Sequence, residues 1–232
     1  MKRAIVTGAS SGIGRAVAEI LLENGWTVGL LARRKEQLDE VASGRAGAMT
    51  LAADVTDAAQ VEDAFNRFTG AYGGLDLLFN NAGIFVPPAM IDDIPLADWD
   101  RSVAVNLTGM FLCARAAFGV MRRQSPQGGR IINNGSISAH VPRDCAVCYT
   151  VTKHAITGLT RQLALDGREV DIACGQIDIG NARTDMIEAL ITRAREAGEP
   201  VPESFDVRLV AQSVLQMAEL PLSANVLFQT IM

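Results

Sequence analysis

Tyr149 and Lys153 lie four residues apart in a segment with helical apolar spacing, so their side chains would share one helix face. A tyrosine exchanges protons near neutral pH only when its phenolate is stabilised, and a neighbouring ammonium provides such stabilisation. The pair therefore indicates general acid–base chemistry at a reacting oxygen. Only one other tyrosine, Tyr72, competes for this role.

Two further polar residues, Ser136 and Asn106, are candidates for a role beside this pair. Ser136 lies 13 residues before Tyr149, at the end of a short apolar run, where its hydroxyl would orient and polarise a substrate oxygen. Asn106 lies within a long predicted helix. Each has an ordinary alternative: Ser136 as a turn hydroxyl, Asn106 as a helix-bending polar residue, and Tyr149 as a half-buried helix residue. Ser138 is the second candidate serine.

A glycine-rich segment, TGASSGIG at 7–14, separates a short apolar run from a helical pattern. Such a turn brings backbone amides and a helix N-terminus close to a pyrophosphate. The alternative is a tight strand-to-helix turn without a ligand. Because the segment follows the first strand of an alternating pattern, nucleotide binding is favoured. The expected contacts are Gly8, Ser10, Ser11, Gly12, Ile13 and Gly14.

Short apolar runs and amphipathic segments alternate along the chain, which predicts a doubly wound α/β domain with a seven-stranded parallel sheet. We expect one domain over residues 1–232, with an irregular substrate loop near 180–206. The predicted strands are Ala4–Thr7, Thr27–Ala32, Met49–Ala53, Leu75–Asn80, Arg130–Asn134, Asp171–Ile177 and Asn225–Ile231. The predicted helices are Ile13–Glu23, Lys35–Ala42, Ala58–Ala71, Leu96–Arg123, Cys148–Leu165, Asp185–Ala197 and Val207–Glu219.

Composition excludes several classes of protein. The 232 residues carry 21 Lys and Arg against 26 Asp and Glu, a net charge of −5 that offers no broad surface for nucleic acid or anionic membrane. The most apolar run, MFLCARAAFGVM, is interrupted by Arg115, and the N-terminus lacks a signal-peptide core. We therefore expect a cytoplasmic protein with neither a nucleic-acid nor a membrane partner.

Four cysteines are too few for a disulfide framework in a chain of this length. Cys145 and Cys148 form a C-x-x-C pair, but no second metal-ligand pair accompanies it, and the only histidines are His140 and His154. We expect reduced thiols, no metal site, and histidines whose hydrogen bonds are satisfied within a loop and a helix.

The spacing Gly8-x3-Gly12-x-Gly14 resembles the glycine motif of classical short-chain dehydrogenases/reductases, and the resemblance extends along most of the chain. Asp54-Val55 resembles the pair that contacts adenine in that family, and Asn80-Asn81-Ala82-Gly83 resembles its N-N-A-G segment. Asn106, Ser136, Tyr149 and Lys153 match its catalytic tetrad in order and spacing.

This resemblance implies a Rossmann-type fold and hydride transfer between nicotinamide and a carbonyl or secondary alcohol. Tyr149 would be the general acid or base, Ser136 would polarise the substrate oxygen, and Asn106 would hold a water that relays protons through Lys153. Lys153 would also bind the nicotinamide ribose. The further cofactor contacts implied are Asp54, Val55, Asn81, Ala82, Gly83 and Tyr149.

The end of the second strand predicts which nicotinamide cofactor binds. An acid there would bind the 2′-hydroxyl of NAD, whereas this chain has Ala32 followed by Arg33 and Arg34. A guanidinium forms two charge-assisted bonds to a phosphate, so we expect NADP, with Arg33 and Arg34 as contacts. The alternative is that both arginines are solvated. Ser11 stands where some NADP-dependent relatives have a second basic residue.

After the sixth strand the chain departs from the family pattern, because Ile179 replaces the usual proline. Gly180 and Thr184 keep the register, which implies cofactor contacts from the Ala182 backbone and Thr184. We expect Asp178 to be an exposed loop acid without a role. Residues lining the substrate pocket are expected in Val86–Ile94, His140–Cys148 and Met186–Ser204.

The resemblance also implies a homodimer or homotetramer built from the two long helices, whose outer faces are expected to carry Ala114, Ala116, Ala117, Leu159, Leu163 and Leu165. The substrate classes that fit are 3-oxoacyl thioesters, small ketones, sugars and steroid-like alcohols. The alternative function is an NADP-binding sensor without turnover, although such a regulator would be expected to have lost Tyr149 or Lys153.

Overall fold

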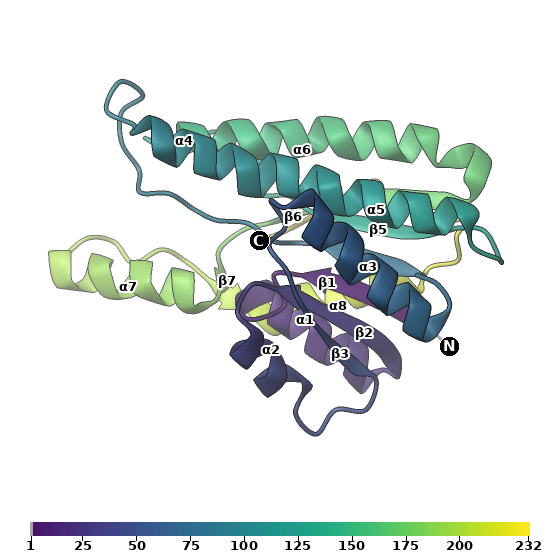
Figure 1. Ribbon diagram of the computed structural model, residues 1–232. Coiled ribbons are helices and arrows are strands. Elements are labelled where there is room, and N and C mark those ends of the chain that lie inside the picture. Colours follow the sequence, from purple (N-terminus) through teal and green to yellow (C-terminus); the bar gives the residue numbers. More distant parts are fainter. Residues whose placement is uncertain (1) are drawn as a thin grey trace.

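A seven-stranded parallel sheet forms the centre of the molecule in the computed structural model (Figure 1), which describes residues 2–232 apart from the side chains of Met186, Ala189 and Leu190. The strand order is β3-β2-β1-β4-β5-β6-β9, so the chain reverses its winding direction between β1 and β4. This confirms the predicted doubly wound sheet. The strands are β1 (Lys2–Thr7), β2 (Trp26–Ala32), β3 (Ala48–Ala52), β4 (Leu77–Asn80), β5 (Gly129–Asn134), β6 (Ile172–Ile179) and β9 (Phe228–Ile231).

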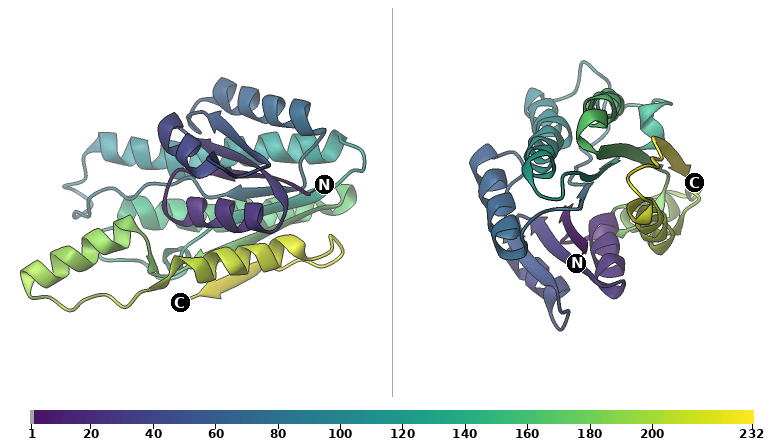
Figure 2. Two further views of the ribbon diagram at one scale, coloured as in Figure 1. Left: turned by 90° about the horizontal axis from the view of Figure 1, so that it is seen from below. Right: turned by 90° about the vertical axis from the view of Figure 1, so that its right-hand side faces the viewer.

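Helices cover both faces of the sheet, as the right-hand view of Figure 2 shows end-on. One buried cluster joins the sheet to α1 (Gly12–Glu23), α2 (Lys35–Ala42) and α8 (Val207–Glu219). A second joins the opposite face to α3 (Ala58–Tyr72) and α5 (Met110–Arg123). The helix α6 (Val147–Asp166) packs on β6 beside them. Burial on both faces explains why the strands are continuously apolar.

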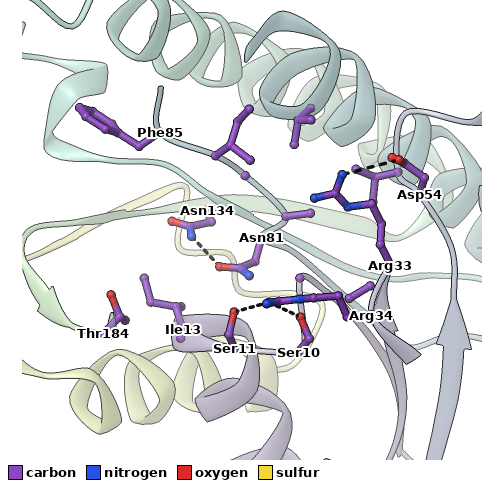
Figure 3. A pocket seen from close by; sticks show the side chains of 18 of the residues that line it. Ser10, Ser11, Ile13, Arg33, Arg34, Asp54, Asn81, Phe85, Asn134 and Thr184 are labelled. Atoms are coloured by element: carbon purple, nitrogen blue, oxygen red, sulfur yellow. Dashed lines mark hydrogen bonds and ion pairs between the residues drawn. The ribbon is translucent and has the colours of Figure 1, made fainter. Parts of the chain in front are cut away.

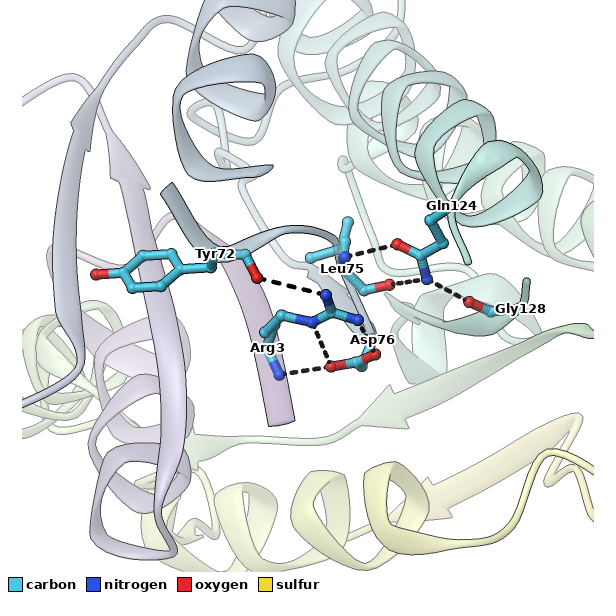
Figure 4. A network of polar contacts seen from close by, with 6 residues as sticks. All are labelled: Arg3, Tyr72, Leu75, Asp76, Gln124 and Gly128. Carbon is cyan, nitrogen blue, oxygen red and sulfur yellow. Dashed lines mark hydrogen bonds and ion pairs between the residues drawn. The ribbon is translucent and has the colours of Figure 1, made fainter. Parts of the chain in front are cut away.

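The fourth strand begins two residues later than predicted. The side-chain amide of Gln124 bonds both the N–H and the carbonyl of Leu75, at 2.8 Å each, and so takes the backbone groups that a strand neighbour would bind. Arg3 and Asp76 add a two-pronged ion pair beside it, with a shortest N–O distance of 2.7 Å (Figure 4). This end of the sheet lies opposite the carboxyl ends of its strands.

Two further strands, β6 and β9, also begin later than predicted. The strand β6 starts at Ile172 because Asp171 has φ = 54°, in the left-handed region, and it continues through Asp178 to Ile179. The strand β9 starts at Phe228 because Arg130 and Asn225 hold the preceding segment as a loop. The Arg130 guanidinium donates to the carbonyls of Leu220, Pro221 and Ala224.

The segment 180–206 is more ordered than predicted. It contains α7 (Asp185–Ala197), at the predicted position, and a two-stranded parallel sheet of β7 (Ala182–Arg183) and β8 (Phe205–Asp206) at its base. Figure 1 shows α7 projecting from the body of the domain. Within the range Met186–Ser204 expected to line the substrate pocket, the side chains of Met186, Ala189 and Leu190 lie outside the described residues.

The predicted helix Leu96–Arg123 is a single helical stretch with a π-helical segment, Ala104–Gly109, between α4 (Leu96–Val103) and α5. Its 28 residues include a window of mean hydropathy 1.5, enough by length and composition alone to cross a membrane. In this fold its buried residues Cys113, Ala117 and Met121 pack against the sheet and α3. Packing therefore accounts for part of its apolar character.

Candidate active site

A cavity of about 510 Å³ opens along the carboxyl ends of β1, β2, β4 and β5, at the point where the strand order reverses. Ligands of open parallel sheets bind at such points. The predicted site residues that line the cavity are Gly8, Ser10, Ser11, Gly12, Ile13, Arg33, Arg34, Asp54, Val55, Asn81, Ala82, Gly83, Tyr149, Lys153 and Thr184. Gly14, Asn106, Ser136 and Ala182 are absent from this lining.

The glycine turn forms one wall of the cavity. Gly8 and Gly12 have φ values of 68° and 52°, in the left-handed region of the backbone that favours glycine. The N-cap of α1, Ser11, makes no side-chain capping bond, and the first turn of the helix has no acidic residue, so its amides are available to an anion. Gly14 has a packing role, because a Cβ there would lie 2.2 Å from the Gly8 carbonyl oxygen.

The segment after β4 is clamped to the end of β1. The Thr7 hydroxyl accepts from the N–H groups of Asn81 and Ala82 at 2.8 and 2.9 Å. The Asn81 side chain donates to the Thr7 carbonyl. It also accepts from Asn134 at 2.7 Å, as Figure 3 shows. These bonds fix Asn81 and Ala82, which line the cavity.

Two guanidinium groups stand at the end of the cavity near Ala32. Arg34 reaches across to the glycine turn and donates to the hydroxyls of Ser10 and Ser11 at 3.2 and 3.3 Å (Figure 3). Arg33 is 70% exposed and lies 4.0 Å from Asp54. Position 11 is a serine and not a basic residue, but Arg34 places its positive charge beside it. This end of the cavity is therefore suited to a phosphate.

Tyr149 and Lys153 lie at the other end of the cavity, on one face of α6. Lys153 is buried, and its ammonium lies 5.5 Å from the centre of the Tyr149 ring. Its Nζ donates a 2.8 Å hydrogen bond to the Asn134 carbonyl. The Phe85 ring meets the Tyr149 ring edge-on, with centroids 5.2 Å apart, and fixes the plane of the phenol.

Asn106 and Ser136 are buried just behind this end. The Asn106 side chain accepts from the Ile84 N–H at 2.7 Å and donates to the Ile84 carbonyl at 2.9 Å. Asn106 thus fixes the chain next to Phe85, from within the π-helical segment, a feature often found at functional sites. The Ser136 hydroxyl accepts from the Ser138 N–H at 3.1 Å. The buried Ser138 hydroxyl has no hydrogen-bond partner among the residues that the structure describes.

Ala182 does not present its amide to the cavity, because its N–H donates to the Gly180 carbonyl at 2.9 Å. Its contact with a cofactor carboxamide stays a prediction. Thr184, two residues later, does reach the lining and packs toward the glycine turn.

The expectation for Asp178 was wrong. Its side chain is fully buried, and Oδ2 lies 2.8 Å from Nε2 of His140. Strand β6 extends past it, which turns a presumed loop residue inward. His154 bonds the Thr150 carbonyl within α6. Among the described residues, no three His, Cys, Asp or Glu side chains gather as they would around a metal ion, and all four cysteines are free.

Comparison with protein families gives one decisive match. Residues 2–194 match the model of the short chain dehydrogenases. The chain belongs to this family. As a member it is an oxidoreductase of the NAD(P)-dependent type that acts on CH–OH groups.

Individual short chain dehydrogenases and related oxidoreductases resemble it over most of their length. An uncharacterized oxidoreductase of Staphylococcus aureus strain N315 is 32% identical over 97% of this chain and 94% of its own. A D-beta-hydroxybutyrate dehydrogenase of Rhizobium meliloti is 35% identical over 94% of this chain and 91% of its own length. The fold is also similar to that of a 3-ketoacyl-(acyl-carrier-protein) reductase from Brucella melitensis, whose crystal structure is a complex with NADH. The two superpose with a TM-score of 0.90 at 24% identity, over 99% of this chain and 96% of the Brucella chain.

Sequence reasoning missed several residues of the site. Phe85 precedes the range expected to line the substrate pocket, and an aromatic residue after the N-N-A-G segment was its only signal. Thr7 and Asn134 end two of the predicted strands, where they had no assigned role. Their part emerges only when β1, β4 and β5 are placed side by side.

Proposed function

We propose that this short chain dehydrogenase interconverts a carbonyl and a secondary alcohol with NADP, using Tyr149, Lys153, Ser136 and Asn106 as its catalytic group. The observation that carries the proposal is the placement of Tyr149 and Lys153 together at one end of a cavity whose other end holds two arginines. A phosphate-binding end and a proton-transfer end are what a nicotinamide oxidoreductase requires.

The cavity suits a dinucleotide. The glycine turn offers backbone amides and a free helix N-terminus to the pyrophosphate, and Asp54 and Val55 line the wall for the adenine. The bound cofactor would supply the hydride. We assign the remaining chemistry to the protein side chains.

In the reducing direction the Tyr149 hydroxyl donates a proton to the substrate oxygen. The Lys153 ammonium, held by the Asn134 carbonyl, stabilises the phenolate that remains. The Ser136 hydroxyl hydrogen-bonds the same oxygen and stabilises the charge that develops there. Lys153 then passes a proton to the Tyr149 phenolate and regains one from a water. In our proposal Asn106, which holds the Ile84 backbone, also holds that water.

The preference for NADP rests on Arg33 and Arg34. No acidic side chain occupies position 32, and Arg34 bridges the two serines of the glycine turn. A 2′-phosphate between these guanidinium groups would accept charge-assisted hydrogen bonds from both. The Brucella reductase has the same fold and was crystallised with NADH, so the fold alone does not support NADP, and the proposal rests on these local residues.

For the substrate we propose a compound oxidised or reduced at carbon 3 of an acyl chain. The Rhizobium relative is named for hydroxybutyrate and the Brucella structure for 3-ketoacyl groups, which share this position. In the segment 180–206, α7 projects from the body of the domain, and in our proposal this segment forms the substrate loop.

The test is a spectrophotometric screen of the purified protein with NADPH. The panel holds 3-oxoacyl thioesters, free 3-oxo acids, simple ketones, sugars and steroid ketones, with the matching alcohols and NADP⁺ for the reverse direction. We expect turnover with the 3-oxoacyl group above the others. Binding of NADPH without turnover on any member would favour a cofactor-binding sensor instead.

A further inference from the structure

Asp178 carries a buried carboxylate that the proposed mechanism does not use. It is 0% exposed, and burying an acid without hydrogen-bond partners is costly. Its partners are specific. Oδ1 accepts from the Ser136 backbone N–H at 3.0 Å and from the Gln176 side-chain amide at 2.7 Å, and Oδ2 faces His140. One of the three contacts is therefore the backbone of the proposed catalytic serine.

The turn before Ser136 is shaped to admit this carboxylate. A Cβ at Gly135 would lie 2.0 Å from Asp178 Oδ1 and 2.7 Å from the Gln176 amide nitrogen. Any side chain at position 135 would displace the acid from the Ser136 amide. Glycine is required here for close approach, and what approaches is the Asp178 carboxylate.

The same carboxylate is joined to the helix that carries Tyr149. Gln176 donates both to Asp178 and to the Thr157 hydroxyl, and its oxygen accepts from Thr160 at 3.0 Å. Both threonines belong to α6. A chain of buried hydrogen bonds thus links the Ser136 turn on one side to the tyrosine helix on the other, and His140 covers the acid from solvent.

We propose that Asp178 is a positioning residue for Ser136: it anchors the serine turn to α6, so that the Ser136 and Tyr149 hydroxyls converge on one substrate oxygen. The inference rests on the proposed function, because it gives Ser136 its catalytic part. Small displacements of a donor aimed at a developing charge are costly, so losing the anchor lowers turnover while leaving the distant nucleotide contacts intact.

The experiment is a double-mutant cycle of Asp178→Ala with Ser136→Ala, measured as kcat and KM for the best carbonyl and Kd for NADPH. Asp178→Asn is the conservative variant, since its amide oxygen can still accept from Ser136 and Gln176. Asp76→Asn is the matched control, because it removes a carboxylate from an ion pair at the opposite end of the same sheet (Figure 4). Gly135→Ala displaces the acid without removing it, and replaces Asp178→Ala if that variant fails to fold.

We expect Asp178→Ala and Gly135→Ala to lower kcat about ten- to a hundredfold, with Kd for NADPH within twofold of the parent. In the Ser136→Ala background neither should lower kcat further. Asp178→Asn should recover kcat to within about threefold of the parent, and Asp76→Asn should leave kcat unchanged.

The positioning role is overturned if the losses of kcat in Asp178→Ala and Ser136→Ala multiply in the double mutant. It is also overturned if Asp178→Asn loses as much kcat as Asp178→Ala, or if neither Asp178 variant changes kcat. In these cases the proposed function still stands if the parent enzyme is active and its Tyr149→Phe variant is inactive. A parent protein without turnover on the whole panel overturns the function, and the inference with it.

Discussion

Lys153 donates a 2.8 Å hydrogen bond from its buried ammonium to the backbone carbonyl of Asn134, at the carboxyl end of β5. This bond fixes a positive charge one helical turn from Tyr149 and beside the cavity. A buried ammonium needs such a partner, because burying an unpaired charge is costly. Lys153 is therefore close to the Tyr149 phenol and also lines the cavity.

Replacing Lys153 with methionine should therefore damage two properties at once. We expect kcat to fall at least a hundredfold, because the phenolate loses its counter-charge, and NADPH affinity to fall about tenfold, because the ammonium no longer lines the cavity. Steady-state kinetics and a fluorescence titration measure the two effects. Lys2→Met, which removes an exposed lysine paired with Glu219, should change neither. A loss of kcat with unaltered NADPH affinity would contradict the double role.

Cofactor choice should reverse when the arginine end of the cavity is altered. The parent should bind NADPH more tightly than NADH, and Ala32→Asp combined with Arg33→Ser should bind NADH more tightly. Losing an exposed guanidinium contact to phosphate should cost roughly 1–2 kcal/mol, about five- to thirtyfold in affinity. Arg67→Ala, on the outer side of α3, is the matched control. Equal affinities of the parent for both cofactors would refute the assignment.

We expect the protein to self-associate through α5 and α6. Some of the residues that the sequence predicted on the outer faces of these helices do not lie there. Ala114 and Ala117 are buried within the chain, so the predicted outer face was wrong at these positions. Phe111 and Leu165 are 48% and 55% exposed on the same two helices, and an apolar face of this kind is typical of an interface.

We expect light scattering at micromolar concentration to give the mass of a dimer or tetramer. Phe111→Glu with Leu165→Glu should reduce that mass to the monomer, whereas Leu209→Glu, at an exposed leucine of α8, should not. A monomeric parent would rule out the assembly.

The four thiols should differ sharply in reactivity. Burial raises the pKa of Cys113 and of Cys174 to about 12, and it also raises the pKa of Cys148. A raised pKa keeps the thiol protonated at neutral pH, and the thiolate is the reactive form. Cys145 is exposed, and its sulfur faces Met90 at 3.8 Å. An aromatic disulfide reagent at pH 7.5 should modify one equivalent rapidly, and Cys145→Ser should abolish that phase. Two rapid equivalents would contradict this ranking.

Local patterns predicted the fold and most of the cavity. The glycine turn and the Tyr149–Lys153 pair are set by spacing within single segments, and their neighbours follow from the parallel sheet. The helices α2, α7 and α8 have the predicted bounds, because their apolar spacing and flanking residues are local signals.

What the sequence could not predict depends on contacts between distant segments. Asp178 reads as a loop acid until β6 is extended beside β5, which brings Ser136 and His140 onto its carboxylate. The late start of β4 depends on Gln124, 49 residues beyond the Leu75 groups that it binds. The bridge from Arg34 to the glycine turn likewise requires β1 and β2 to lie side by side.

The central claim is that Tyr149 transfers a proton to a substrate oxygen beside a bound nicotinamide. The most direct test is kcat measured together with the NADPH Kd for the parent and for Tyr149→Phe, on the best substrate of the screen. Removing one hydroxyl while keeping the ring, and with it the Phe85 contact, should lower kcat by about 10²–10⁴-fold and leave Kd within twofold. Full activity in Tyr149→Phe would contradict the proposed chemistry, even with the fold and the cofactor site intact.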